Sequence, residues 1–218
     1  MQRIDLHTHT IKDDGSIQIL NVFAQNLPIE GHESLYSVGL HPWHIASVNP
    51  ENCLQLIEDN AQSPNMLAIG ECGLDRSISA SIELQKHYFT EQIRIAEKHT
   101  KPIIIHCVRA YYDLISIKKQ LKSNLPWIIH GYSGNKETTL NLIKYGFFFS
   151  VGEQMVGHES KHDILRMIPT ERLFLETDDN EYPIKDMYIL AAQILKVDEE
   201  SLSEAIFNNF KRLFGNRQ

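Results

Sequence analysis

The sequence of 218 residues predicts an α/β protein, and within that class a TIM barrel, the eight-stranded (β/α)8 fold. Two observations lead to this prediction. Short hydrophobic runs rich in branched and aromatic residues recur along the chain, bounded by Gly, Pro or charged residues, as is typical of buried parallel strands. Longer segments with helical spacing lie between most of these runs. The length fits a single domain, residues 1–218, with one hydrophobic core.

Eight strands are expected. The first two are Ile4–His7 and the weaker run Ile17–Phe23, and the others are LYSVGL, NMLAIGE, PIIIHC, PWIIHGY, GFFFSVG and RLFLETD. Eight strands in a chain of this length favour a compact barrel over a doubly wound open sheet, which is the alternative. The space between His9 and Ile17 is too short for a normal helix, so the first βα unit is expected to be truncated to a loop.

Helices are expected in the segments that separate the later strands. Asn49 and Pro50 form a cap and first turn for a helix that runs to about Asn60. The segment from about Ser81 to His99 repeats hydrophobic residues at helical spacing. The further helices expected are Tyr111–Leu121, Lys136–Tyr145, Lys161–Met167, Lys185–Leu195 and Glu200–Phe214.

Histidines and carboxylates stand at the carboxyl ends of six expected strands. They are His7 and His9, His41, Glu71 and Asp75, His106, His130, and Glu176, Asp178 and Asp179. In a βα barrel these strand ends form one rim, which carries the active site. Imidazole and carboxylate together are the ligand set of zinc, manganese or iron, so we predict a metal site that can hold two ions.

This ligand set predicts hydrolysis. Two neighbouring divalent ions need a shared anionic ligand, and Glu71, at the end of a central strand, is the best candidate. Asp178 is expected to bind one ion and to orient or deprotonate the attacking water. The sequence contains no GxSxG, P-loop or dinucleotide-binding glycine pattern.

The composition of the chain limits which classes of partner it can bind. The net charge of −7 does not provide a broad electrostatic grip on a phosphate backbone, so nucleic acid has to be bound at a local site. No hydrophobic run is long enough to span a bilayer, and no secretory signal is recognisable, so we expect a cytoplasmic protein without a membrane partner. Three cysteines without CxxC spacing indicate reduced thiols.

Seven motifs resemble, in order, those of the TatD family of metal-dependent hydrolases: DLHTH, GLHPW, GECGLD, PIIIHCVR, HGYSG, LETDD and NNFKRLF. The resemblance implies a TIM barrel of the amidohydrolase-like superfamily with two divalent ions, for which Zn, Mn, Mg, Fe and Ni are all candidates, and deoxyribonuclease (DNase) activity. It also implies two ligand sets, one comprising His7, His9, Glu71 and Asp178, the other comprising Glu71, His106 and His130.

Other residues near these motifs receive narrower predictions. Asp5 lies on the same strand face as the histidines and is expected to support a ligand, or else to be a buried structural carboxylate. His41, Arg109 and Tyr132 are the candidate substrate contacts, and Arg109 can clamp a phosphate with two hydrogen bonds. Trp43 is expected to pack in the core.

The chain departs from the family pattern at two rim loops, after His9 and after Asp179, and both are shortened. Rim loops select the substrate in this fold, so the reaction, hydrolysis, is better supported than the identity of the substrate as DNA. A small phosphoester or another ester or amide is an alternative substrate. The opening DLHTHTIKDDG also resembles the polymerase-and-histidinol-phosphatase (PHP) family of three-metal phosphoesterases. A metal-bearing binding module without catalysis is the non-enzymatic alternative.

Overall fold

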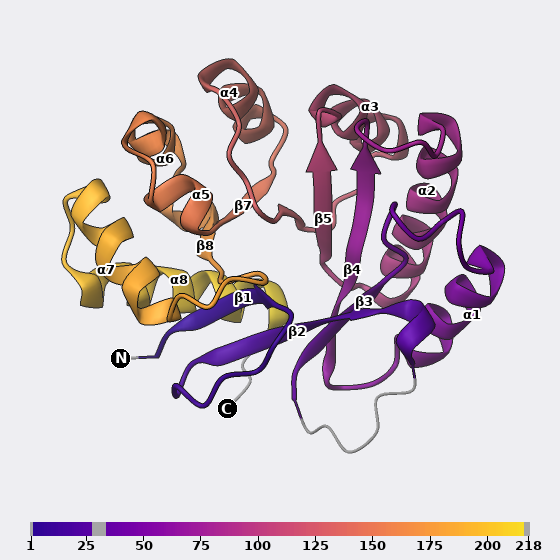
Figure 1. Ribbon diagram of the computed structural model, residues 1–218, viewed down its shortest axis with the longest axis horizontal. Coiled ribbons are helices and arrows are strands. Elements are labelled where there is room, and N and C mark those ends of the chain that lie inside the picture. The colour runs from indigo at the N-terminus through magenta and orange to yellow at the C-terminus, as the bar shows by residue number, and fades with distance from the viewer. Residues whose placement is uncertain (1, 28–33, 216–218) are drawn as a thin grey trace. The chain divides into compact units, whose positions relative to one another are not determined.

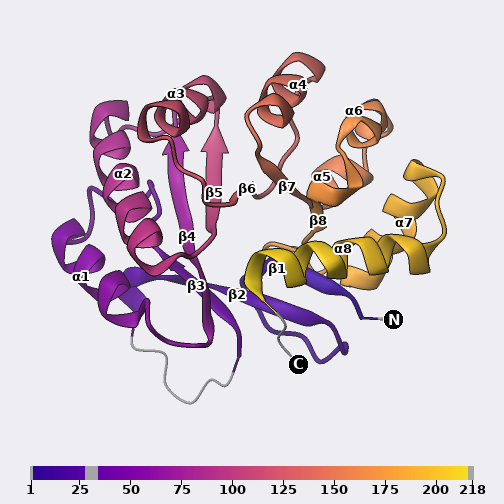
Figure 2. The same cartoon turned by 180° about the vertical axis from the view of Figure 1, so that it is seen from behind.

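The computed structural model describes residues 2–27 and 34–215, and Figures 1 and 2 show its elements from opposite sides. The strands are β1 Ile4–Thr8, β2 Ile17–Phe23, β3 Tyr36–Gly39, β4 Met66–Asp75, β5 Ile103–Val108, β6 Trp127–Ile129, β7 Phe148–Val151 and β8 Leu173–Leu175. The α-helices are α1 Pro50–Asn60, α2 Ile82–His99, α3 Tyr111–Leu121, α4 Lys136–Lys144, α5 Glu153–Val156, α6 His162–Met167, α7 Ile184–Leu195 and α8 Glu199–Phe214. Short 3-10 turns lie at Ala24–Asn26, Glu159–Lys161 and Thr170–Arg172.

The strands follow one another in the sheet in chain order, from β1 to β8. Strand β1 pairs with β2, β3 with β4, β4 with β5, and β7 with β8, each time in parallel. A further parallel bridge joins Thr8 at the end of β1 to Asp178, just beyond β8. Parallel strands in sequence order, alternating with helices, are the topology of a βα barrel, and all eight predicted strands are present.

The helices agree closely with the predicted segments. Side chains at Asn49, Ser81, Asn135 and Asp198 each accept a hydrogen bond from the backbone N–H three residues on, which caps α1, α2, α4 and α8. The loop between β1 and β2 contains no helix, so the first βα unit is truncated as predicted. Helix α5 was not predicted, because a single turn is too short to show helical periodicity.

The chain divides into two compact units. The first unit comprises Met1–Leu20 and Ile129–Gln218, and the second unit comprises Asn21–Ile128. Each unit has a hydrophobic interior formed by its strands and by the helices that pack on them. The extent of the domain, residues 1–218, stays a prediction from length and composition.

In the first unit, buried polar side chains fix helices to strand ends. The Tyr188 hydroxyl of α7 donates to the carbonyl of Ile4 and accepts from the backbone N–H of the same residue, at 3.1 and 3.0 Å. The amide of Asn209 on α8 donates to the carbonyls of Thr170 and Leu173. These bonds satisfy backbone groups in the interior and hold β1 and β8 in place.

In the second unit, helix α2 packs along β4, and two buried glutamines of the helix fix strand ends. Gln92 bonds both the N–H and the carbonyl of Leu40, and Gln85 does the same for Asp75. Each glutamine therefore completes the hydrogen bonding of a residue just where a strand gives way to a loop. The positions of His41 and Asp75 depend on these contacts.

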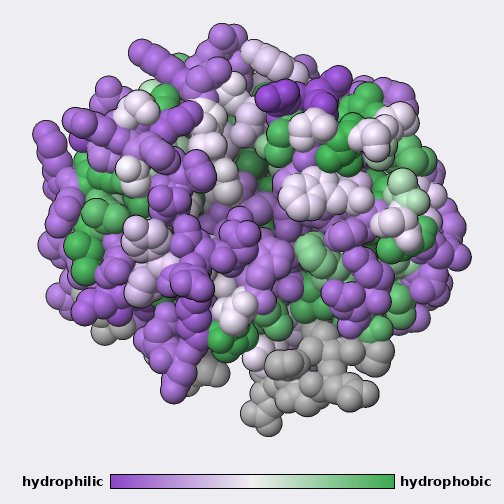
Figure 3. Space-filling model, viewed as in Figure 1, coloured by the Kyte–Doolittle hydropathy of each residue, from purple (hydrophilic) through white to green (hydrophobic). Residues whose placement is uncertain are grey.

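The face drawn in Figure 3 is mostly hydrophilic, with hydrophobic side chains in separate groups. Among the described residues, none of the helices has both the length and the hydropathy required to cross a membrane.

Candidate metal centre

The first unit brings together His7, His9 and Asp178. The backbone of Asp178 pairs with β1 on both sides, because its N–H donates to the carbonyl of His7 and its carbonyl accepts from the N–H of His9. This pairing places Asp178 Oδ1 at 3.3 Å from His9 Nε2 and 3.7 Å from His7 Nε2. His7 is fully buried, whereas His9 and Asp178 are partly exposed. The three side chains can hold one cation while remaining accessible to a substrate.

His130 lies beside this group, just beyond β6. Its ring centroid is 4.3 Å from that of His7. Its Nδ1 is 3.6 Å from Glu176 Oε1, which also accepts a hydrogen bond from the N–H of Gly131. Glu176 is completely buried, so it is placed to orient His130 and the turn that follows it. We call His7, His9, His130 and Asp178 the first cluster.

Asp5 supports the first cluster through the backbone. Its carboxylate accepts hydrogen bonds from the N–H and the hydroxyl of Thr177, at 2.9 and 2.6 Å, and Thr177 precedes Asp178. Burial raises the pKa of Asp5 to about 7, even though the two bonds from Thr177 act in the opposite direction. Asp5 is thus positioned to hold the segment that carries Asp178.

A cavity of about 130 Å³ opens beside Asp178, between the turn after β6, the start of α5 and the loop after β8. The shortened loops lie close by, because Lys12 Nζ donates to the carbonyls of Asn180 and Tyr182. The two truncated rim segments of the first unit are therefore joined to each other.

The second unit brings together Glu71, His41 and His106. Glu71 Oε1 lies 3.0 Å from His41 Nε2 and 2.9 Å from His106 Nδ1. His41 Nδ1 accepts from the N–H of Trp43, so the ring proton of a neutral His41 is on Nε2 and is donated to Glu71. His41 is buried and its ring holds the Glu71 carboxylate, and its predicted contact with a substrate stays a prediction.

Asn21 fixes Glu71 from the other side. Its amide donates to Glu71 Oε2 at 3.2 Å, and its carbonyl oxygen accepts from the N–H of Glu71 at 3.1 Å. The carboxylate is therefore held by one amide and two imidazoles within the second unit. Asn21 was not predicted as a site residue, since an asparagine in a weak hydrophobic run carries no ligand pattern.

Asp75 holds His106 and Trp43 with the same oxygen atom. Asp75 Oδ2 accepts from Trp43 Nε1 at 2.8 Å and lies 3.1 Å from His106 Nε2. Asp75 Oδ1 accepts from the N–H and the hydroxyl of Ser77. Burial by itself would raise the pKa of Asp75, but the bonds from Ser77, Trp43 and His106 outweigh it and lower the pKa to about 2. We call His41, Glu71, Asp75 and His106 the second cluster.

Gly73 allows β5 to approach β4 at this point. Gly73 is paired with His106 across the two strands, and a Cβ atom at position 73 would collide with the backbone of His106. Its φ of +148° is also one that side-chain-bearing residues rarely adopt. The glycine therefore sets the spacing that brings His106 to Glu71.

Three further residues were singled out in the sequence, and the structure gives their exposure. Tyr132 is buried, with its hydroxyl 2.7 Å from that of Thr139, and its role as a substrate contact stays a prediction. Arg109 lies just after β5, and its side chain is exposed to solvent. Trp43 is 59% exposed, so the predicted packing role is wrong for this residue.

The donors of both clusters fit divalent transition metals. Imidazole nitrogens and carboxylate oxygens of His7, His9 and Asp178, and separately those of His41, Glu71 and His106, lie within 4.8 Å of one another. Such donors suit zinc, manganese and iron. Burial raises the pKa of the thiols of Cys72 and Cys107, which disfavours the thiolate form needed for a cysteine nucleophile.

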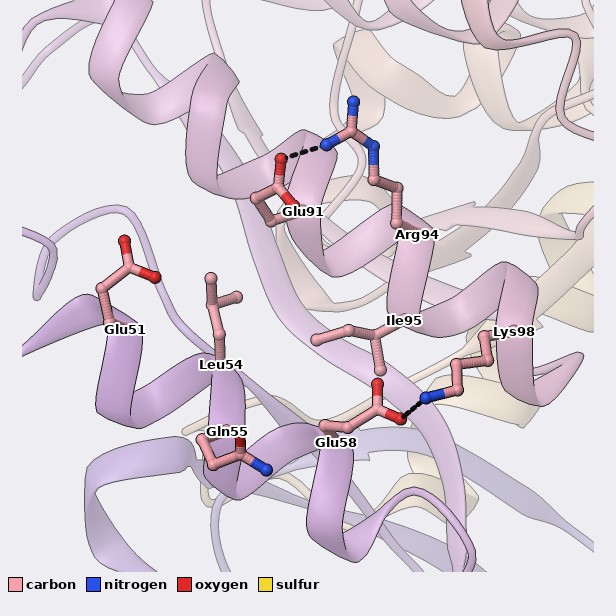
Figure 4. Close-up of a pocket in the computed structure, with 8 residues that line it drawn as sticks. All are labelled: Glu51, Leu54, Gln55, Glu58, Glu91, Arg94, Ile95 and Lys98. Atoms are coloured by element: carbon pink, nitrogen blue, oxygen red, sulfur yellow. Dashed lines mark hydrogen bonds and ion pairs between the residues drawn. The ribbon is translucent and has the colours of Figure 1, made fainter.

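A groove of about 300 Å³ between α1 and α2 carries no comparable chemistry (Figure 4). It is lined by Glu51, Leu54, Gln55, Glu58, Glu91, Arg94, Ile95 and Lys98. Its charged side chains pair with each other, Arg94 with Glu91 and Lys98 with Glu58. This described lining contains neither imidazole nor thiol, and we assign it no function.

The fold matches that of solved TatD-family structures. The chain superposes on the YjjV TatD homologue of Escherichia coli K12 with a TM-score of 0.87 at 20% identity, covering 99% of this chain and 98% of that one. A TatD family hydrolase from Entamoeba histolytica gives a TM-score of 0.80 at 17% identity, covering 99% of both chains. The predicted TIM barrel is thereby confirmed, and the class of protein is a barrel with the donor set of a metal-dependent hydrolase.

Residues 24–215 match the TatD related DNase family, and the chain belongs to that family. It is 32% identical over 149 residues to the 3'-5' ssDNA/RNA exonuclease TatD of Cronobacter turicensis, a match that covers 65% of this chain and 56% of that protein. It is 29% identical over 204 residues to the uncharacterized metal-dependent hydrolase YabD of Bacillus subtilis, covering 85% and 80%. The chain thus spans little more than half the length of the TatD exonuclease. The family match decides against the PHP alternative.

Proposed function

We propose that this protein is a divalent-metal-dependent hydrolase that cleaves phosphodiester bonds, with DNA as its substrate. The observation that carries the proposal is the first cluster, in which three imidazoles and a carboxylate converge beside a cavity. The names of one relative, an exonuclease, and of the matching family, TatD related DNase, support the same reaction. The finer assignment of DNA over a small phosphoester rests on those names.

The ligand assignment follows the family motifs. His7, His9 and Asp178 are proposed as ligands from the first unit, together with His130, and Glu71 and His106 as ligands from the second unit. Two ions are proposed, and Glu71 is proposed to serve both. The distances within each cluster support ligand roles for these residues.

A divalent ion bound by such donors supplies positive charge that lowers the pKa of a water molecule and polarises a phosphoryl oxygen. Asp178 is the proposed proton acceptor, because its side chain is partly exposed and its backbone is fixed by the pairing with β1. His41 keeps the Glu71 carboxylate in place, and Asp75 does the same for the His106 ring. Arg109 is proposed to contact the substrate phosphate.

The test uses the full chain, stripped of metal and reloaded with Mn²⁺ or Zn²⁺, on an end-labelled single-stranded oligonucleotide. Wild-type protein is expected to cleave it, and Asp178→Asn is expected to lose at least about a hundredfold in rate, since a positioned base usually contributes that much. Asp163→Asn, an exposed carboxylate on α6, is the matched control and is expected to retain full activity.

Two results would overturn parts of the proposal. Turnover of an ester or amide panel without phosphodiester cleavage would remove the nuclease assignment and leave a hydrolase of another substrate class. Stoichiometric metal binding without any turnover would favour a binding module.

A further inference from the structure

Trp43 is the exposed aromatic side chain of the second unit that touches the second cluster. It follows β3, directly after His41 and Pro42, and 59% of it is open to solvent. Its ring centroid lies 4.8 Å from that of His41 and 5.7 Å from that of His106, both edge-on. A large apolar surface is therefore presented to solvent beside two side chains of the second cluster.

The indole is held in one orientation. Its Nε1–H donates to Asp75, which is 1% exposed and keeps its other oxygen on Ser77. Its backbone N–H donates to His41. A hydrogen bond to a buried carboxylate is among the stronger ones in proteins, so little conformational freedom remains for the ring to lose when a ligand binds.

The negative net charge of the chain favours a mode of nucleic-acid binding that does not depend on phosphate contacts. With a net charge of −7, the protein cannot rely on phosphate contacts alone to hold a polyanion. Stacking of bases on aromatic side chains supplies affinity that does not depend on phosphate charge, and it requires unpaired bases. A fixed, exposed indole next to candidate metal ligands is suited to this purpose.

We propose that Trp43 is a base-stacking residue, and that it selects substrates with an unpaired nucleobase next to the bond to be cleaved. The inference rests on the proposed nuclease function and adds a specificity-determining residue to it. Asp75 connects base stacking with the candidate metal ligand His106, since one of its oxygen atoms holds both the Trp43 ring and the His106 imidazole.

Intrinsic fluorescence provides a direct readout, because the chain has two tryptophans and the other, Trp127, is fully buried. The metal-loaded protein is titrated with phosphorothioate oligothymidylate, which resists hydrolysis, and with an abasic oligonucleotide of equal length and charge. The thymidine strand is expected to quench the emission and the abasic strand to leave it unchanged. In Trp43→Phe the quenching is expected to disappear.

Affinity is measured in parallel from the anisotropy of dye-labelled strands. Trp43→Ala is expected to weaken binding of the thymidine strand about tenfold and to leave binding of the abasic strand within about twofold. Trp43→Phe keeps an aromatic ring and is expected to lose less. Tyr112→Ala, which removes an exposed aromatic of α3 in the same unit, is the matched control and should change neither.

Equal binding of thymidine and abasic strands by wild-type protein, or an equal loss in Trp43→Ala and Tyr112→Ala, would overturn the stacking role. If the strands are cleaved normally in that case, the proposed nuclease function stands while the inference fails. If wild-type protein neither binds nor cleaves any strand, both fail together.

Discussion

Replacing Asp75 by Asn tests how the second cluster is organised. Asp75 accepts from Trp43 and His106 on one oxygen and from Ser77 on the other. An amide cannot reproduce this arrangement, because either orientation turns its NH₂ group towards N–H donors. In one orientation His106 loses the acceptor that fixes its ring, and in the other it keeps only a neutral and weaker one while Ser77 faces the NH₂ group.

The expected size of the effect follows from the pKa of Asp75, which these bonds lower from 3.8 to about 2. That shift corresponds to about 2.5 kcal/mol of preference for the carboxylate, shared among the donors. The bond to His106 contributes least of the four, so at most about a quarter of this preference acts through it, which lowers the affinity for a divalent ion about threefold. Loss of a group that orients a metal ligand usually costs about tenfold or more, so a fall of about threefold to tenfold is expected.

The assay is calorimetric titration of metal-stripped protein with Mn²⁺ or Zn²⁺. Asp113→Asn is the matched control, since this carboxylate belongs to the same unit but pairs with Arg76 and Lys86. Asp75→Asn is expected to lose metal affinity while its near-ultraviolet circular dichroism stays native. Unchanged metal affinity in a folded Asp75→Asn protein would refute the orienting role.

Three further outcomes are expected. Glu71→Ala should lower the measured affinity for both proposed ions. Unchanged metal content by elemental analysis would rule out Glu71 as a ligand that both ions share. Gly73→Ala should cost about 3 kcal/mol of stability in urea denaturation, because its Cβ atom meets the backbone of His106, and a change below about 0.5 kcal/mol would contradict this. Burial lowers the pKa of Lys118 to about 8, so the charged form destabilises the fold below that pH and the penalty fades as pH rises towards 10.5. Lys118→Met should therefore be about 1 kcal/mol more stable than wild type at pH 7, and the difference should shrink by pH 10, whereas a difference independent of pH would count against the burial effect.

The sequence predicted the strands and helices well because their patterns are local. Helix α3 has the predicted bounds, and α1 begins at the predicted cap, since helical spacing and capping residues lie within a few positions of each other. Strands β4 and β5 were recognisable as continuous hydrophobic runs. Helix α5 was not predicted, because a helix of one turn is too short to show helical periodicity.

Candidate ligands could be found from the sequence, but their supporting residues could not. A histidine or carboxylate after a buried strand is a visible signal in a barrel. The contact of Asn21 with Glu71 joins residues 50 positions apart and leaves no pattern in the sequence. The exposure of Trp43 depends on its bond to Asp75, 32 positions away, which is why a packing role was predicted instead.

The measurement that most directly tests the central claim is the metal content of the purified full chain, determined by elemental analysis after reloading and gel filtration. The clusters of imidazole and carboxylate predict about two divalent ions per chain in the wild type, and a clear loss when both His7 and His9 are replaced by Ala. A folded wild-type protein that retains no divalent ion under saturating conditions would contradict the account.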